Sequence, residues 1–161
     1  MFRHGRSSRG FSLIELLVVI AIVSVLASIG LPLTALATQR NKEEDLRRSL
    51  REIRTALDGY KRLVDQGRII RSADAVGYPP TLEVLVDGVV DAQSPNGAKI
   101  YLLRKLPRDP FASESIVESW RTWALRSYAS SAHDPQPGND VFDVHSMHPG
   151  VGLNGVPYRH W

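Results

Sequence analysis

The stretch RGFSLIELL at residues 9–17 decides how this chain is organised, because it opens the longest apolar run in the sequence. From Leu16 to Gln39 no residue is charged, and most are leucine, valine, isoleucine or alanine. A helix needs roughly 20 such residues to cross the hydrocarbon core of a bilayer. The sequence therefore predicts one transmembrane helix, which we expect over residues 11–37.

The positive charge of the chain lies just before this run. The formal net charge is +3 at pH 7, and Arg3, Arg6 and Arg9 account for all of it because acids and bases balance in the remainder. Basic residues beside an apolar span favour a cytoplasmic N-terminus. The charge therefore indicates membrane topology, and we expect no nucleic-acid partner, since no basic surplus exists elsewhere.

Three interpretations of the N-terminus compete. A secretory signal peptide has an apolar stretch of about 7–15 residues, followed by a small-residue cleavage site, and this run is longer. An uncleaved membrane anchor fits the length and the flanking charges, but it leaves Glu15 unexplained, because a carboxylate in a spanning helix is costly. A cleaved leader that ends at Gly10 accounts for both residues.

The motif at residues 9–17 resembles the cleavage and methylation motif of type IV prepilins and type II secretion pseudopilins. In that family a prepilin peptidase cuts after the glycine and methylates the new N-terminus. The resemblance implies that residues 1–10 are a leader peptide and that Phe11 becomes the methylated terminus after cleavage at Gly10. It also implies that Phe11 and Glu15 act in subunit assembly.

Cleavage would place an ammonium group on Phe11, which can pair with the Glu15 carboxylate where the dielectric constant is low. The two residues stand at i and i+4, so a pair within one helix and a pair between neighbouring subunits both stay open. Pro32 falls where the family commonly has a proline and removes a helix hydrogen bond. We interpret it either as a hinge used in assembly or as a passive kink.

Beyond the apolar run, a second helix is expected over residues 38–66, continuous with the first and ended by Gly67. Apolar residues recur there at helical spacing, and the other faces carry charged residues, Arg54 among them. The predicted stripe, which would dock a globular head, consists of Leu46, Leu50, Ile53, Leu57, Tyr60, Leu63 and Val64.

The remaining residues complete an α+β head over residues 38–161. We expect a short helix over residues 82–86 with Thr81 as its cap. About three antiparallel strands packed on the stripe would bury one small core; the extended segments expected are 100–103, 121–127, 141–145 and 157–161. The fold class is a long N-terminal helix, first transmembrane and then amphipathic, packed on a small antiparallel sheet, as in type IV pilin-like proteins.

The order of motifs in the head is similar to that of the major pseudopilins of type II secretion. The segments that carry this resemblance are GYPPT at 77–81, YLLRKLPRDPF at 101–111, Tyr128 and DVHS at 143–146. It implies a homopolymer that drives protein export, anchored once in the bacterial inner membrane with its N-terminus cytoplasmic and its C-terminal domain periplasmic. The implied partners are minor pseudopilins, the prepilin peptidase and the inner-membrane assembly platform with its ATPase.

The C-terminal loop departs from that family, whose members carry several aspartates there that hold calcium. This chain has no acid after Asp143, whereas calcium takes about 6–8 oxygen ligands, several of them carboxylates. Asp140 and Asp143 are weak calcium candidates, and we expect no cofactor.

An enzyme is a poor interpretation of the sequence. His145 and His148 flank a turn, but a zinc site needs three or four converging ligands, and no G-x-S-x-G elbow is present. Two alternatives stay open: a minor pilin or pseudopilin of a type IV pilus or DNA-uptake system, and a membrane-tethered binding domain that does not polymerise.

Overall fold

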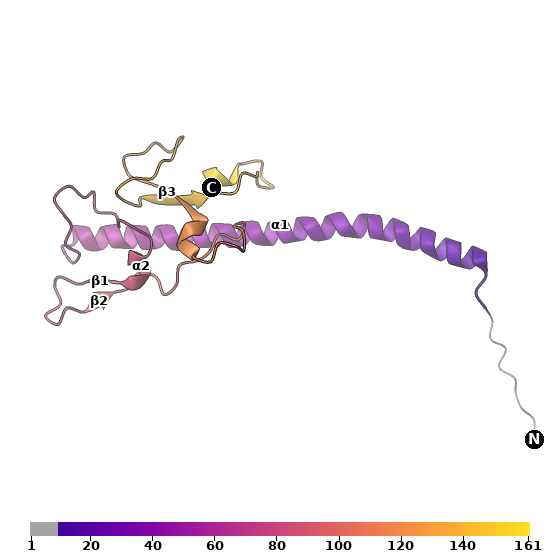
Figure 1. The fold of residues 1–161 in the computed structure, drawn as a ribbon, viewed down its shortest axis with the longest axis horizontal. Coiled ribbons are helices and arrows are strands. Elements are labelled where there is room, and N and C mark those ends of the chain that lie inside the picture. The colour runs from indigo at the N-terminus through magenta and orange to yellow at the C-terminus, as the bar shows by residue number, and fades with distance from the viewer. Residues whose placement is uncertain (1–9) are drawn as a thin grey trace, which may run out of the picture. The chain divides into compact units, whose positions relative to one another are not determined.

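The computed structural model describes residues 10–28 and 33–161. The residues form two compact units, Met1–Arg40 and Asn41–Trp161, and we call the second unit the head. Figure 1 shows the one long helix, α1, which spans Leu13–Asp65. By length and composition α1 is able to cross a membrane. The expectations for residues 1–9 and for Pro32 lie outside the described residues.

The helix α1 begins two residues later than predicted. The amide of Leu16 donates to the carbonyl of Ser12 at 3.1 Å, so Ser12 precedes the first turn and Phe11 lies outside the helix. Hydroxyl groups in the apolar part bond to the backbone of their own helix, since Ser24 Oγ donates to the carbonyl of Ile20 at 2.7 Å. Such a bond satisfies the hydroxyl where the surroundings are apolar.

The apolar part of α1 has no covering in the single chain. Each large apolar side chain from Phe11 to Leu26 is exposed, and Leu13 is exposed by 78%. A helix that is apolar on every side is stable only where lipid or other helices surround it. This part of the chain therefore requires neighbours that a single copy does not supply.

The stripe predicted within the head forms its core. Leu46, Leu50, Ile53 and Leu57 are at most 2% exposed, Tyr60 and Val64 are also buried, and Leu63 packs against them partly buried. The rest of the head contributes the other side of this core: Ile69, Leu82, Leu85, Leu103, Leu106, Trp123, Val141, Val144 and Tyr158.

Gly67 ends the helix as predicted. Its φ is +69°, a left-handed conformation that favours glycine. The amide of Gly67 donates to Val64 at 2.9 Å, and the amide of Arg68 donates to Leu63 at 2.9 Å. These two bonds form a Schellman motif, which satisfies the last carbonyls of the helix.

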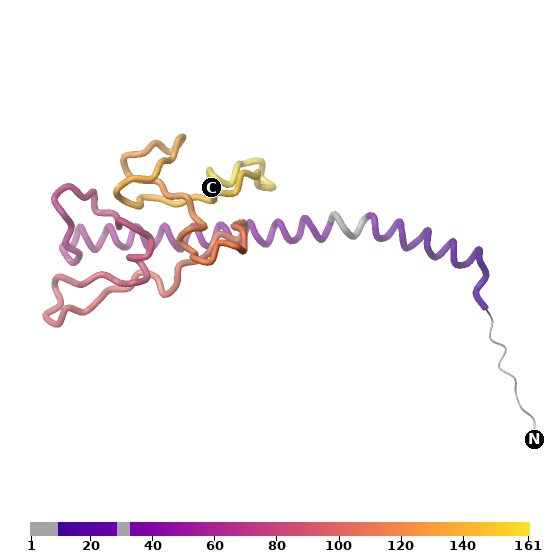
Figure 2. The backbone as a smooth tube through the Cα atoms, in the orientation of Figure 1, coloured from indigo at the N-terminus to yellow at the C-terminus, as the bar shows by residue number. Residues whose placement is uncertain are grey.

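The strands form two small antiparallel sheets instead of one. In the first, β1 (Val89–Val90) pairs with β2 (Lys99–Ile100); in the second, β3 (Trp123–Arg126) pairs with β4 (Asp143–Ser146). The β3–β4 register runs from Trp123 opposite Ser146 to Arg126 opposite Asp143. Both pairs can be followed along the backbone in Figure 2.

Two predictions for the middle of the head are wrong in detail. The short helix α2 spans Val84–Asp87, and Glu83 is its N-cap residue, so Thr81 does not cap it. The segment expected to be extended over 100–103 leaves its strand after Ile100. The reason is that the amides of Leu102 and Leu103 both donate to the carbonyl of Leu85, at 3.1 and 2.9 Å.

The last segment is not a strand. A short 3₁₀ helix, η1, spans Ser119–Thr122 before β3, and a second, η2, spans Tyr158–His160 near the C-terminus. Within 157–161 only Pro157 makes a strand-like contact, an isolated bridge to Val151. Tyr158 is 1% exposed, and a turn of helix places its ring in the core.

Candidate functional site

The residues expected to act in assembly lie at the start of α1. Gly10 and Phe11 are exposed ahead of the helix, and Glu15 is the acidic residue of its first turn. A carboxylate there interacts favourably with the helix dipole. Ser12 and Glu15 also have the spacing of a capping box, in which the glutamate accepts a bond from the backbone of the serine. Two candidate roles of Glu15, a local cap and the expected charge partner, therefore have to be separated by experiment.

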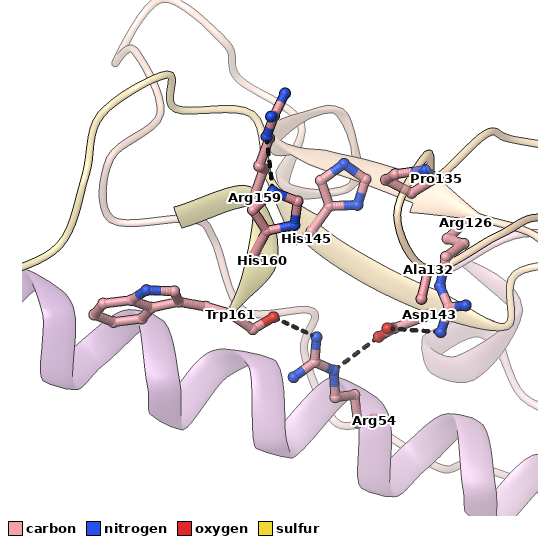
Figure 3. A pocket seen from close by; sticks show the side chains of 9 residues that line it. All are labelled: Arg54, Arg126, Ala132, Pro135, Asp143, His145, Arg159, His160 and Trp161. Atoms are coloured by element: carbon pink, nitrogen blue, oxygen red, sulfur yellow. Dashed lines mark hydrogen bonds and ion pairs between the residues drawn. The ribbon is translucent and has the colours of Figure 1, made fainter. Parts of the chain in front are cut away.

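In the head, the calcium candidate Asp143 lies beside a cation that belongs to the chain. Arg54, on α1, donates from Nε to Asp143 Oδ1 at 2.7 Å. Its Nη2 donates to the carbonyls of Val144 at 3.2 Å and Trp161 at 2.7 Å. Figure 3 shows this guanidinium between the carboxylate and the last residue. One side chain of α1 thus binds oxygens from both β4 and the C-terminal segment.

A second arginine completes the surroundings of Asp143. Arg126, on β3, donates from Nη2 to Asp143 Oδ2 at 3.2 Å, and its guanidinium lies 4.6 Å from the ring centroid of Phe142. The amide of Val144 donates to Asp143 Oδ1 at 2.8 Å. We call the group of Arg54, Arg126 and Asp143 the arginine centre.

The residues present do not fit a calcium ion. Asp140 accepts a bond from the amide of Tyr128 at 2.8 Å, whereas Asp143 is held by guanidinium groups. Across residues 10–28 and 33–161, no group of three or more His, Cys, Asp or Glu side chains is arranged to hold a metal ion. In the arginine centre, Arg54 and Arg126 already bind the two carboxylate oxygens of Asp143, so a calcium ion would have to compete with them.

We expect chelation to leave the stability of the head unchanged. A metal present at a hundred times its Kd would add about 2.7 kcal/mol to the free energy of unfolding, so its removal would lower Tm by several degrees. The measurement is a thermal melt of residues 41–161 in EGTA and in calcium. A Tm that falls in EGTA and recovers with calcium would show that Asp140 and Asp143 do bind the metal.

Two buried carboxylates were not singled out from the sequence. Glu43 accepts bonds from the amide of Leu153 at 2.8 Å and from Tyr158 Oη at 2.9 Å. Asp109 accepts bonds from Ser146 Oγ at 2.6 Å and from the amide of Phe111 at 2.8 Å. Both fix loops to the core. The position of Glu43 could have indicated its burial, because it lies three residues before the first residue of the apolar stripe and therefore on the same face of the helix.

Residues 150–155 read GVGLNG, the glycine spacing of a dinucleotide-binding fingerprint. That fingerprint has meaning only between a strand and a helix. Here Gly155 donates to the carbonyl of Gly152 at 2.9 Å in a tight turn, and Gly152 donates to Val156 at 2.9 Å. His148, close by, accepts the amide of Gly150 at its Nδ1. The segment is a closed turn and offers no such phosphate-binding helix.

The chain is similar to known proteins both at its N-terminus and over most of its length. Residues 5–31 match the family described as the prokaryotic N-terminal methylation motif. The chain is 29% identical over 139 residues to type II secretion system core protein G of Klebsiella michiganensis, covering 84% of this chain and 90% of that protein.

Two further relatives are similar over shorter stretches. Type II secretion system core protein G of Pseudomonas aeruginosa is 32% identical over 112 residues, or 67% of this chain and 71% of that protein. Type IV major pilin protein PilA of Myxococcus xanthus is 31% identical over 78 residues, or 48% of this chain and 34% of that protein. No solved structure matches the chain significantly.

Proposed function

Because the chain belongs to the type II secretion system core protein G family, we propose that it polymerises through its N-terminal helix into a pseudopilus that drives protein export. In this proposal residues 1–10 are the leader, residues 11–37 are the membrane-spanning and filament-core helix, and residues 38–161, which include the head, are periplasmic. The subunit has a structural role and no catalytic one.

One observation carries the proposal. The apolar side chains at the start of α1 are exposed on every side in the single chain. Lipid can surround them before assembly, and helices of neighbouring subunits can surround them afterwards. Lipid alone would account for a helix that serves only as a membrane anchor. The methylation motif that includes the start of this helix supports packing against the helices of neighbouring subunits as well.

The proposed partners are those that processing and assembly of the subunit require. Prepilin peptidase would act at Gly10 and Phe11 on the cytoplasmic side of the inner membrane, and an assembly platform with its ATPase would extract the subunit. Copies of the chain itself, with minor pseudopilins, would form the filament. The type IV pilus alternative has less support, because the match to a pilin covers only 34% of that protein.

We expect the mature protein to begin at Phe11 and to carry one added methyl group. Intact mass measurement and N-terminal sequencing of protein purified from membranes of its native host would test this. The matched variant is Gly10→Val, which should remain uncleaved. A Cβ at Gly10 meets no atom within 4 Å, so the folded chain accommodates it and a loss of cleavage reports recognition by the peptidase. A mature wild-type protein that retains Met1 would refute the proposal.

A further inference from the structure

A cavity of about 690 Å³ lies in the head, between the segment 70–80 that follows α1 and the loop 127–140 that joins β3 to β4. Both segments can be followed on the same side of α1 in Figure 2. We call it the tyrosine cavity, after Tyr60 of α1 and Tyr78, which both line it. Ligand sites in proteins have volumes of roughly 300–1,000 Å³, so the tyrosine cavity is large enough for a small organic molecule.

Two hydroxyl groups of buried residues open into this cavity. Tyr60 is 8% exposed and Ser127 is 6% exposed, and both line the cavity. Within residues 10–28 and 33–161, neither Tyr60 Oη nor Ser127 Oγ has a hydrogen-bond partner. In the same part of the chain, every side-chain nitrogen or oxygen that is sealed from solvent does have a partner. The two hydroxyls are therefore accessible from the cavity, where a ligand is able to bond to them.

Both hydroxyls are able to donate a hydrogen bond as well as to accept one. Burial raises the pKa of Tyr60, because surroundings of low dielectric constant disfavour the phenolate. The phenol therefore keeps its proton at neutral pH. An ammonium group on a ligand would only donate to these oxygens, and a carboxylate would only accept from them. A ligand hydroxyl does both, so the two groups favour a ligand that is rich in hydroxyls.

The charged residues of the wall do not favour an anion. They are Arg71, Asp74 and Asp140, one cation against two carboxylates. Arg71 Nη1 already donates to two carbonyls of its own segment. Asp140 Oδ1 accepts the amide of Tyr128 at 2.8 Å, whereas Oδ2 accepts no bond from the described residues. Since hydrogen bonds to an ionised acceptor are strong, Oδ2 is a suitable acceptor for a ligand hydroxyl.

Apolar side chains form another part of the wall. Tyr78, Ile70 and Val76 line the cavity, and Ile70 is 84% exposed. The ring of Tyr78 is fixed by its neighbours, because it stacks on Tyr128 with the centroids 6.0 Å apart and meets the edge of Phe142 at 4.9 Å. The wall thus combines an apolar surface with hydroxyl and carboxylate groups. A sugar has the matching surface, since its ring has C–H faces and an edge of hydroxyls.

Hydrogen bonds hold the two sides of the cavity in place. The amide of Val141 donates to the carbonyl of Pro79 at 2.8 Å, which ties the segment 70–80 to the end of the loop. The amide of Ser127 donates to the carbonyl of Gln136 at 3.0 Å across the loop itself. Gly138 packs so closely on Ser127 that a Cβ there would lie 2.7 Å from the Cβ of the serine. A site fixed in this way loses little conformational entropy when a ligand binds.

We propose that the tyrosine cavity binds a neutral sugar, whose hydroxyls bond to Tyr60 Oη, Ser127 Oγ and Asp140 Oδ2 and whose C–H face packs on Tyr78. A disaccharide is long enough to contact both sides of the cavity, so the three oxygens need not meet at one ligand atom. All of these residues belong to one head. The proposal therefore goes beyond the proposed function, and each of the two can fail without the other.

Isothermal titration with maltose, cellobiose, lactose and diacetylchitobiose tests the site. The full chain is kept in micelles of a detergent that carries no sugar headgroup, and micelles without protein are titrated in parallel. We expect saturable binding of at least one of these disaccharides, with one molecule per chain. The hexasaccharide of the sugar that binds then separates two sources: equal or tighter binding indicates a polysaccharide chain, and loss of binding indicates a free disaccharide.

Two variants each remove one oxygen atom from the cavity and leave the rest of the side chain. Tyr60→Phe and Ser127→Ala should each weaken binding about three- to tenfold, the effect of losing one hydrogen bond. Because these hydroxyls have no partner within the described residues, neither variant should lower Tm in the absence of sugar. The matched control is Tyr101→Phe, a tyrosine that is 63% exposed beside Gly88 and outside the cavity, and its affinity should equal that of the wild type.

Three results would overturn the proposal. The first is that none of the four disaccharides binds saturably to the wild-type protein. The second is that Tyr60→Phe and Ser127→Ala bind as tightly as Tyr101→Phe. The third is that both variants lower Tm by several degrees without sugar, since their hydroxyls would then serve the fold.

Discussion

Replacing Glu15 with leucine is expected to reduce filament assembly and protein export at least tenfold, while membrane insertion and cleavage after Gly10 continue. Before assembly the carboxylate would lie near the membrane surface, where water keeps its cost small. In a filament it would be enclosed by the apolar side chains of α1 and would need a positive partner. The ammonium group of processed Phe11 is the partner we propose.

The size of this effect follows from the Coulomb energy. Two unit charges 4 Å apart attract by about 4 kcal/mol at an effective dielectric constant of 20, before desolvation is subtracted. A remainder of only about 1.4 kcal/mol per subunit would account for a tenfold change in an equilibrium constant. Phe11 lies outside α1, and we propose that its amino group pairs with Glu15 of a neighbouring subunit.

A matched variant separates the charge from the helix cap. Glu15→Gln keeps a side chain suited to the capping box but loses the charge, so it should assemble as poorly as Glu15→Leu. Glu15→Asp keeps the charge on a shorter side chain and should be intermediate. Sheared filaments and secreted protein, each normalised to processed subunit, are the measurements. Normal assembly by Glu15→Leu would rule out the charge pair, and normal assembly by Glu15→Gln alone would assign Glu15 to capping.

Removing the guanidinium of Arg54 is expected to destabilise the head by about 2–3 kcal/mol, the cost of breaking several hydrogen bonds to charged and partly buried groups. In Arg54→Ala, Asp143 keeps Arg126, but the carbonyls of Val144 and Trp161 lose the bonds that Arg54 donates. The side chain of Arg54 is 37% exposed. For that reason we expect less than the about 3–5 kcal/mol that breaking a fully buried pair costs.

Urea denaturation of residues 41–161 would measure this change. The control is Arg51→Ala, an exposed arginine on the same helix, which should change the free energy of unfolding by less than about 0.5 kcal/mol. Arg54→Lys keeps a positive charge but cannot bind three oxygens in the same geometry, so it should fall between the two. If Arg54→Ala and Arg51→Ala are equally stable, the arginine centre does not hold the head together.

The helix of the head was predictable because its signals are local. The repeat from Leu46 to Val64 and the stop at Gly67 both depend on residues within a few turns of one another. The segment at 157–161 was not predictable in this way. Its conformation is set by Tyr158 packing into a core whose other side comes from α1, far away in the sequence.

The arginine centre escaped prediction for the same reason. Arg54 stands among charged residues that face solvent, and nothing near it in the sequence distinguishes it from Arg51. Its partner Asp143 lies 89 residues away. From the sequence, Asp143 was only a weak calcium candidate, and the fold shows that its cationic partners are the side chains of Arg54 and Arg126.

A cation supplied by Arg54 has a consequence for how the head responds to its surroundings. Occupancy of a metal site rises and falls with the concentration of the ion outside the cell. A tethered guanidinium is always at a high effective concentration at its site, and it stays charged at any physiological pH. A filament built from such heads would keep its strength in media poor in minerals.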